Sequence, residues 1–154
     1  MAEKTADKLD EKDERILDEL RKDSRQSTAD ISRRTDIPRV TVHERIRKLK
    51  EKGVIKSFTI ASDYAKLGMP TSAYLLIGYQ PHQGITEWEL AEKLVKTPYV
   101  YEVNIISGDY DMLVKVRGAS IEDIGRLVVQ KVREMKGVGK ATTMACYHTF
   151  GEKI

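Results

Sequence analysis

Features of secreted, metal-binding and membrane proteins are missing from this sequence. The single cysteine, Cys146, excludes an intramolecular disulfide. The three histidines show no metal-site spacing to one another or to the cysteine, and they are His43, His82 and His148. No apolar run approaches the roughly 20 residues of a membrane span, and the opening MAEKTADKLDEKDE is charged where a signal peptide is apolar. We therefore expect a cytoplasmic protein without structural zinc, in which Cys146 is a buried, inert thiol.

Catalytic motifs are also missing. The segment GVGKA at 137–141 lacks the upstream glycine and the Ser/Thr of a phosphate-binding loop, and it lies between a predicted helix and a predicted strand. Ser107-Gly108-Asp109 is not a nucleophile elbow, and no histidine lies near it in the sequence to act as a base. We expect a protein that is not an enzyme and that needs no cofactor.

Positive charge is concentrated in one short segment. The chain is 40% hydrophobic and 33% charged, a composition typical of folded soluble domains. Residues 39–56 carry seven Lys/Arg against two Asp/Glu, whereas residues 63–154 carry eleven of each. A local basic stripe is what the neutralisation of DNA phosphates requires, although a solvated helix face has the same composition.

The first third of the chain predicts three helices. Asp10 is placed to cap a helix that runs to about Lys22, and Ser27 to cap a short helix that ends near Arg34. Asp36 tolerates a left-handed turn, and Pro38 suits the first turn of a third helix over 39–52, which Gly53 ends. The inward residues of the three helices are Ile16, Leu17, Leu20, Ala29, Ile31, Val42, Ile46 and Leu49.

Two short helices joined by a tight turn, the second with a basic outer face, are typical of a helix-turn-helix that inserts its second helix into the major groove. The alternative is an ordinary three-helix packing unit with a solvated basic face. The predicted DNA-binding residues are Arg39, Val40, Thr41, His43, Glu44, Arg47 and Lys48.

These residue types suit different parts of DNA. Arg39 and Arg47 can donate to guanine or to phosphates, and the short polar groups of Thr41 and His43 suit base edges. For Glu44 three roles stay open: it accepts from a cytosine amino group, it holds a neighbouring arginine, or it pairs with Lys48 four residues on. The lysines at 48, 50, 52 and 56 contact phosphates or solvate the helix.

After Gly53 the alternation in VIKSFTIA predicts a half-buried strand, and DYAKLGMP at 63–70 predicts a linker. The remainder predicts a β-α-β-β-α-β order, which is the ferredoxin-like α+β plan with both helices on one sheet face. Its elements are expected over 72–80, 85–96, 100–107, 111–118, 120–135 and 141–150. The expected domains are 1–55 (helix-turn-helix), 56–70 (hinge strand and linker) and 71–154 (ferredoxin-like).

The predicted sheet has one face that its own helices do not cover. The strands over 73–79 and 112–116 have apolar residues on both sides, and so small a domain has no second layer of its own. We therefore expect at least a dimer.

Three blocks of the sequence resemble one family. They are LDEKDERIL at 9–17, VHERIRKLKEKGVI at 42–55 and SGDYDMLVKV at 107–116. In this order they are similar to the Lrp/AsnC (leucine-responsive, feast/famine) transcriptional regulators of bacteria and archaea, and the resemblance covers residues 9–149. Two positions depart from the family pattern: Asp36 stands where a glycine is common, and Pro38 where a serine often caps the recognition helix.

The resemblance implies a sequence-specific regulator, commonly autoregulatory, whose hinge strand pairs with that of a partner subunit. It implies a ferredoxin-like domain that builds homodimers and often tetramers or octamers. It also implies a small effector, usually an amino acid, bound between dimers at a turn formed here by Ser107, Gly108, Asp109, Tyr110 and Asp111. From the residues alone, glycine permits a close ligand approach and either aspartate suits an ammonium group, but a plain hairpin connection explains the same turn.

Two other functions remain open at this stage. Some tetrapyrrole-processing decarboxylases resemble this family in architecture, but they need basic and histidine groups around the effector-side cavity. Here the basic residues crowd the predicted recognition helix instead. An architectural DNA-compacting protein without an effector is the other alternative, and a sharp operator footprint would separate it from a specific regulator.

Overall fold

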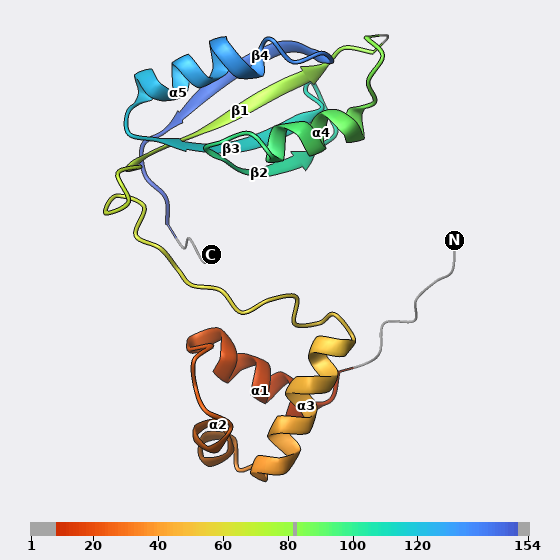
Figure 1. The fold of residues 1–154 in the computed structure, drawn as a ribbon, viewed down its shortest axis with the longest axis vertical. Coiled ribbons are helices and arrows are strands. Elements are labelled where there is room, and N and C mark those ends of the chain that lie inside the picture. Colours follow the sequence, from red (N-terminus) through yellow and green to blue (C-terminus); the bar gives the residue numbers. More distant parts are fainter. Residues whose placement is uncertain (1–8, 82, 151–154) are drawn as a thin grey trace. The chain divides into compact units, whose positions relative to one another are not determined.

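The chain folds into two compact units that divide between Ile60 and Ala61 (Figure 1). A computed structural model describes residues 9–81 and 83–150. The expectations for the opening residues 1–8, for His82 and for residues 151–154 lie outside the described residues. The domain limits 1–55, 56–70 and 71–154 stay a prediction.

The described part of the first unit contains the expected helices. They are α1 (Glu11–Lys22), α2 (Thr28–Thr35) and α3 (Arg39–Glu51). Asp10 caps α1 in a capping box with Asp13, and Ser27 caps α2 by accepting from the Asp30 backbone N–H. The cap residues read from the sequence are therefore confirmed, because each satisfies backbone donors that the first helical turn leaves unpaired.

The turn between α2 and α3 has the conformation that its residues favour. Asp36 adopts the left-handed region at φ 51°, and Pro38 is the N-cap residue of α3, one position before the first turn. Ile16, Ile31, Ile37 and Val42 form a buried cluster beneath the turn, with Leu20 and Ile46 packed against it. The helix-turn-helix is thus held by apolar residues from every helix of the unit's described part.

A charged contact fastens α3 to the start of α1. The Arg45 guanidinium donates to Asp10 and to Asp13, with Nη1 to carboxylate distances of 2.7 and 2.8 Å. The same two carboxylates form the α1 capping box. Hydrogen bonds from the Asp13 backbone and then from Arg45 hold the pKa of Asp10 below its ordinary value.

The strand predicted over Val54–Ala61 is not formed by the single chain. Val54, Phe58 and Ile60 are exposed there, Ile60 by 73%. The prediction of a half-buried strand is wrong for the isolated chain, because a strand needs a hydrogen-bonded neighbour and the described residues provide none beside this segment.

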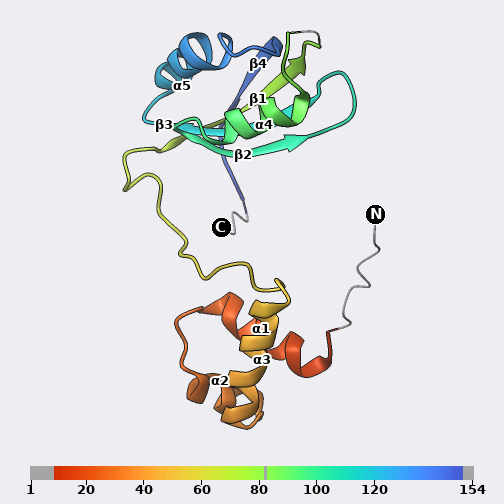
Figure 2. The same cartoon turned by 45° about the vertical axis from the view of Figure 1, so that its right-hand side comes forward.

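The second unit has the predicted β-α-β-β-α-β order. Its elements are β1 (Thr71–Tyr79), α4 (Glu87–Val95), β2 (Val100–Ile105), β3 (Met112–Gly118), α5 (Ile121–Leu127) with the π-helical turn η1 (Val128–Val132), and β4 (Val138–Cys146). The strands are antiparallel in the order β2-β3-β1-β4. Both α4 and α5 lie on one face of the sheet (Figure 1 and Figure 2), as the ferredoxin-like plan requires.

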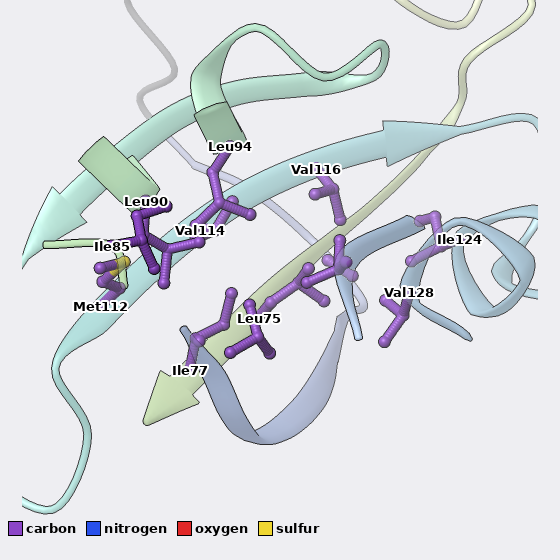
Figure 3. Close-up of a cluster of buried hydrophobic side chains, with 13 residues drawn as sticks. Leu75, Ile77, Ile85, Leu90, Leu94, Met112, Val114, Val116, Ile124 and Val128 are labelled. Atoms are coloured by element: carbon purple, nitrogen blue, oxygen red, sulfur yellow. The ribbon is translucent and has the colours of Figure 1, made fainter. Parts of the chain in front are cut away.

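The core lies between that face and the two helices. Leu90 and Leu94 of α4 and Ile124 of α5 point toward the strand side chains in Figure 3. The strands contribute alternate residues, which are Ala73, Leu75, Ile77, Met112, Val114 and Val116. The core-facing residues of each strand therefore recur with a period of two, as in a sheet that turns one face to the helices.

Two details differ from the sequence expectation. The helix predicted over 120–135 changes to a π-helical turn at Val128, and β4 starts at Val138 and ends at Cys146.

Cys146 is half-buried, so the prediction of a buried thiol is wrong: β4 is an edge strand and the cysteine ends it. Hydrogen bonds, first from Thr149 and then from Ser72, lower the pKa of the Cys146 thiol below its ordinary value.

Residues 63–69, predicted as part of a plain linker, form a turn of the second unit that packs on β2 and β3. The buried Arg117 guanidinium lies 3.9 Å from the centre of the Tyr64 ring, and Tyr64 meets Tyr101 edge to face at 5.1 Å. The Tyr101 hydroxyl donates to the Met69 sulfur at 3.2 Å. Arg117, over the Tyr64 ring and 5.9 Å from the centre of the Tyr101 ring, therefore anchors the end of the linker.

The opposite sheet face has no covering layer in the described part of the second unit. Leu76 of β1 pairs in register with Leu113 of β3 and Thr142 of β4, and Tyr74 pairs with Met144. All of these side chains are half-buried or exposed. The prediction of apolar residues on both sheet faces is thus confirmed.

Candidate functional site

The face of α3 opposite the core carries Val40, Glu44, Arg47 and Glu51, which recur at the spacing of one helical stripe. Val40 is 76% exposed, and the three charged side chains are each about half exposed, between 50% and 57%. Val42 and Leu49 on the other side are buried. The sequence prediction that Val40, Glu44 and Arg47 face outward is consistent with these positions.

Basic side chains flank this outward stripe on both sides. Lys48 and Lys52 recur on one side together with the half-buried Thr41, and Arg39, His43 and Lys50 recur on the other. Arg39 Nε donates to the Thr28 hydroxyl of α2 at 3.3 Å, and Lys50 Nζ lies 5.7 Å from the Phe58 ring centre. A helix with cations along both margins suits a groove whose two walls are phosphate backbones.

Arg47 is held between two carboxylates. Its Nη1 donates to Glu51 Oε1 at 2.7 Å, and its Nη2 donates to Glu44 Oε2 at 3.3 Å. The hydrogen bond that Arg47 donates to Glu44 is the largest cause of a raised pKa for Arg47, and the charge of Glu51 adds to it. Of the three roles left open for Glu44, the described residues show the contact with the neighbouring arginine and not the pair with Lys48.

The N-terminus of α3 has no side-chain cap, because Pro38 stands at the N-cap position. Its first backbone N–H groups therefore remain donors for an anion such as a DNA phosphate. A groove of about 470 Å³ runs along α3, between this helix and the start of α1. Its lining includes Val40, Thr41, Glu44 and Lys48 of the predicted DNA-binding set.

In the second unit, the turn predicted to bind an effector connects β2 to β3. Ser107, Gly108 and Asp109 are exposed, and Gly108 adopts φ 125°, a conformation that favours glycine. Asp111 has a structural contact: its Oδ2 accepts from the Tyr79 backbone N–H at 2.6 Å, where β1 and β4 shift register. Asp109 is therefore the turn's carboxylate that extends into solvent.

Tyr110 of this turn crosses to β4. Its hydroxyl lies 2.9 Å from the Thr142 hydroxyl, and Lys140 Nζ lies 5.3 Å from the centre of its ring. The hydrogen bond with Thr142, followed by that with Lys140, lowers the pKa of Tyr110 below its ordinary value. The end of the turn next to β3 is thus fixed by two contacts, that of Tyr110 with Thr142 of β4 and that of Asp111 with Tyr79 of β1.

The described residues lack metal-binding clusters and membrane-spanning helices. They contain no group of three or more His, Cys, Asp or Glu side chains able to hold a metal ion. None of their helices is long and apolar enough to cross a membrane.

Comparisons with known proteins match both units in chain order. A winged helix-turn-helix DNA-binding model matches residues 9–56, and an Lrp/AsnC ligand-binding domain model matches residues 72–153. The chain belongs to the Lrp/AsnC family. An uncharacterised HTH-type transcriptional regulator of Pyrococcus furiosus is 46% identical over 97% of this chain and 99% of its own length. The regulator FL11 of the same organism is 38% identical over 88% and 87%.

Solved structures of the Lrp/AsnC family have the same fold. LrpC of Bacillus subtilis superimposes with a TM-score of 0.83 at 25% identity, over 95% of this chain and 99% of that protein. A transcriptional regulator of Neisseria meningitidis, solved as a complex with L-Met, has a TM-score of 0.85 at 16% identity over 96% of each chain. The chain is thus a DNA-binding transcriptional regulator with a ligand-binding domain, related to regulators and not to enzymes.

Three residues with a part in these sites were missed by sequence reasoning. Glu51 holds Arg47, Arg45 joins α3 to α1, and Thr142 positions Tyr110. The spacing of four residues between Arg47 and Glu51 was a visible signal for the first. The other two contacts join residues 35 and 32 positions apart, which no local pattern reports.

Proposed function

We propose that this Lrp/AsnC protein recognises specific operator sequences through the outward face of α3 and regulates its own gene among others. The supporting observation is the arrangement of that face, with base-reading side chains along its centre and cations along both margins. Arg47 and Glu44 are types that contact guanine and cytosine, and Val40 suits a thymine methyl group. Such a protein acts in the cytoplasm of a prokaryotic cell, where its DNA is.

The first test is binding to the DNA upstream of the protein's own gene at several salt concentrations. We expect tight binding that weakens steeply with salt, and Arg47→Ala to weaken it roughly ten- to hundredfold. Lys56→Ala is the control, because it removes one exposed cation of the same unit outside α3. Absence of binding to this DNA and to genomic fragments would refute the proposal, and equal losses for the two variants would refute a special role for Arg47.

A homodimer is the second part of the proposal. The uncovered sheet face offers Tyr74, Leu76, Leu113 and Met144, and burying such apolar surface drives association. The exposed Phe58 and Ile60 belong to the segment that alternates like a strand but has no neighbour in the single chain. Pairing of this segment with its counterpart in a second copy would supply the missing hydrogen bonds. Further assembly into tetramers or octamers follows the pattern of the family.

An amino acid is the proposed effector, bound at the turn 107–111 where dimers meet. The exposed carboxylate of Asp109 suits an ammonium group, and the conformation of Gly108 leaves the backbone accessible. Tyr110 and Asp111 serve to fix the turn, as their contacts with Thr142 and Tyr79 indicate. That a regulator of the same fold was solved with L-Met supports this ligand class.

Thermal unfolding in the presence of each L-amino acid tests the effector proposal. At a hundredfold excess over Kd a ligand that binds the native protein alone adds about 2.7 kcal/mol of stability. We expect such a shift for at least one amino acid, its loss in Asp109→Asn, and its retention in Glu122→Gln, which removes an exposed carboxylate of α5. No shift with any amino acid would contradict the ligand class, and an unchanged shift in Asp109→Asn would contradict the role of that carboxylate.

A further inference from the structure

Glu51 holds the best-placed arginine of the recognition helix. Glu44 lies one turn before Arg47 and Glu51 one turn after it, so the guanidinium is bound from both sides along the outward stripe. The shorter of the two contacts, at 2.7 Å, is that with Glu51. All three side chains are about half exposed, so the cluster lies on the surface that would face DNA.

Helix stability does not account for this carboxylate. Glu51 is the last residue of α3, where the helix dipole disfavours negative charge. An arginine that precedes a glutamate by four residues is also the weaker order of such pairs. Glu51 therefore sits at an unfavourable position, in contact with the residue most suited to recognise a base.

The chemistry of the guanidinium connects this contact to recognition. Arginine has five N–H donors in a fixed plane, and the two carboxylates take one donor from Nη1 and one from Nη2. The remaining donors keep a defined direction, as bidentate contact with guanine O6 and N7 requires. The three charges sum to one negative charge, so the cluster as a whole is repelled by phosphates.

We propose that Glu51 is a specificity-determining residue that makes Arg47 a base-recognising group and keeps it from binding phosphates indiscriminately. This inference rests on the proposed recognition of DNA by α3. Without Glu51 the arginine keeps only the longer contact with Glu44, at 3.3 Å, and can swing to the phosphate backbone, a contact that every DNA sequence offers. Binding to random DNA then gains a phosphate contact, whereas the operator loses an oriented hydrogen-bond donor. Glu51 thus lowers the affinity for random DNA and thereby raises the ratio of specific to non-specific binding.

The test compares Glu51→Gln with the native chain on two duplexes of equal length. One is the sequence that the native chain enriches from a random-sequence library, and the other is its scrambled version. We expect Glu51→Gln to bind the scrambled duplex roughly three- to tenfold more tightly, with a salt slope steeper by about one, and to discriminate less between the two. Circular dichroism of each variant checks that α3 remains folded.

Two further variants separate this role from a simple change of charge. Asp18→Asn also removes an exposed carboxylate that pairs with an arginine, Arg21, but on α1. We expect it to leave the ratio of the two affinities unchanged, and we expect Glu51→Gln to have no effect on the ratio when Arg47→Ala is already present. Equal changes in Glu51→Gln and Asp18→Asn, or a full effect without Arg47, would overturn the inference while leaving DNA recognition intact. Failure of the native chain to enrich any sequence would overturn both.

Discussion

Replacing Ile31 by alanine is expected to abolish DNA binding although Ile31 is not one of the proposed DNA-contacting residues. The side chain is fully buried at the centre of the cluster formed with Ile16, Ile37 and Val42. Truncating such a residue costs about 2–5 kcal/mol, through lost burial and through the cavity left behind. A three-helix unit of this size has little stability in reserve, since whole domains have only about 5–15 kcal/mol.

Thermal unfolding followed by circular dichroism measures this effect, and DNA binding is assayed on the same samples. Val40→Ala is the matched control, because Val40 is also a β-branched residue of the unit but is 76% exposed. We expect its stability to stay within about 0.5 kcal/mol of the native value. Unchanged unfolding of Ile31→Ala would show that the apolar cluster does not hold the helix-turn-helix together.

Alanine substitutions at two adjacent leucines of β1 should differ in effect: one should lower the stability of the fold, and the other should weaken assembly. Leu75 is fully buried against α4 and α5, whereas Leu76 points to the uncovered face opposite Leu113. Leu75→Ala is expected to destabilise the second unit by about 2–5 kcal/mol. Leu76→Ala should leave the folded chain nearly as stable but weaken the proposed dimer, because only the partner subunit would complete its burial.

Urea unfolding measures the first effect, and sedimentation equilibrium over a range of protein concentrations measures the second. Because dimers are stabilised by mass action, unfolding must be compared at one low concentration at which the chains are monomeric. A monomeric native protein would exclude this face as a dimer contact. Equal destabilisation by the two substitutions would mean that Leu76 belongs to the core of the single chain.

Local order in the first unit was predictable because it is set by near neighbours in the chain. Asp10 and Ser27 cap helices by reaching donors three residues away, and Asp36 takes a left-handed turn by its own intrinsic preference. The apolar spacing in α3 likewise indicated which side is buried and which faces outward. Such features can be predicted from the sequence without knowledge of the fold.

The strand expected over Val54–Ala61 shows where this reasoning fails. Alternation describes which residues suit a strand, but a strand exists only beside another strand, and the single chain places none there. The prediction that Cys146 is buried fails for a related reason. Its apolar neighbours in the sequence suggested burial, whereas the strand order puts β4 at the sheet edge. In both places the deciding neighbour is remote in the sequence or, in the proposed dimer, lies in another molecule.

The sequence by itself determined that there are two units, the order of their helices and strands apart from the expected strand over 54–61, and which side of α3 faces outward, because periodicity and caps are local properties. Only the tertiary structure decided which charged groups remote in the sequence meet. It joined Arg45 to Asp10 and Asp13, and it placed the Asp111 carboxylate on Tyr79. Contacts of this kind span more than 30 residues and depend on packing, so they arise only when the elements come together.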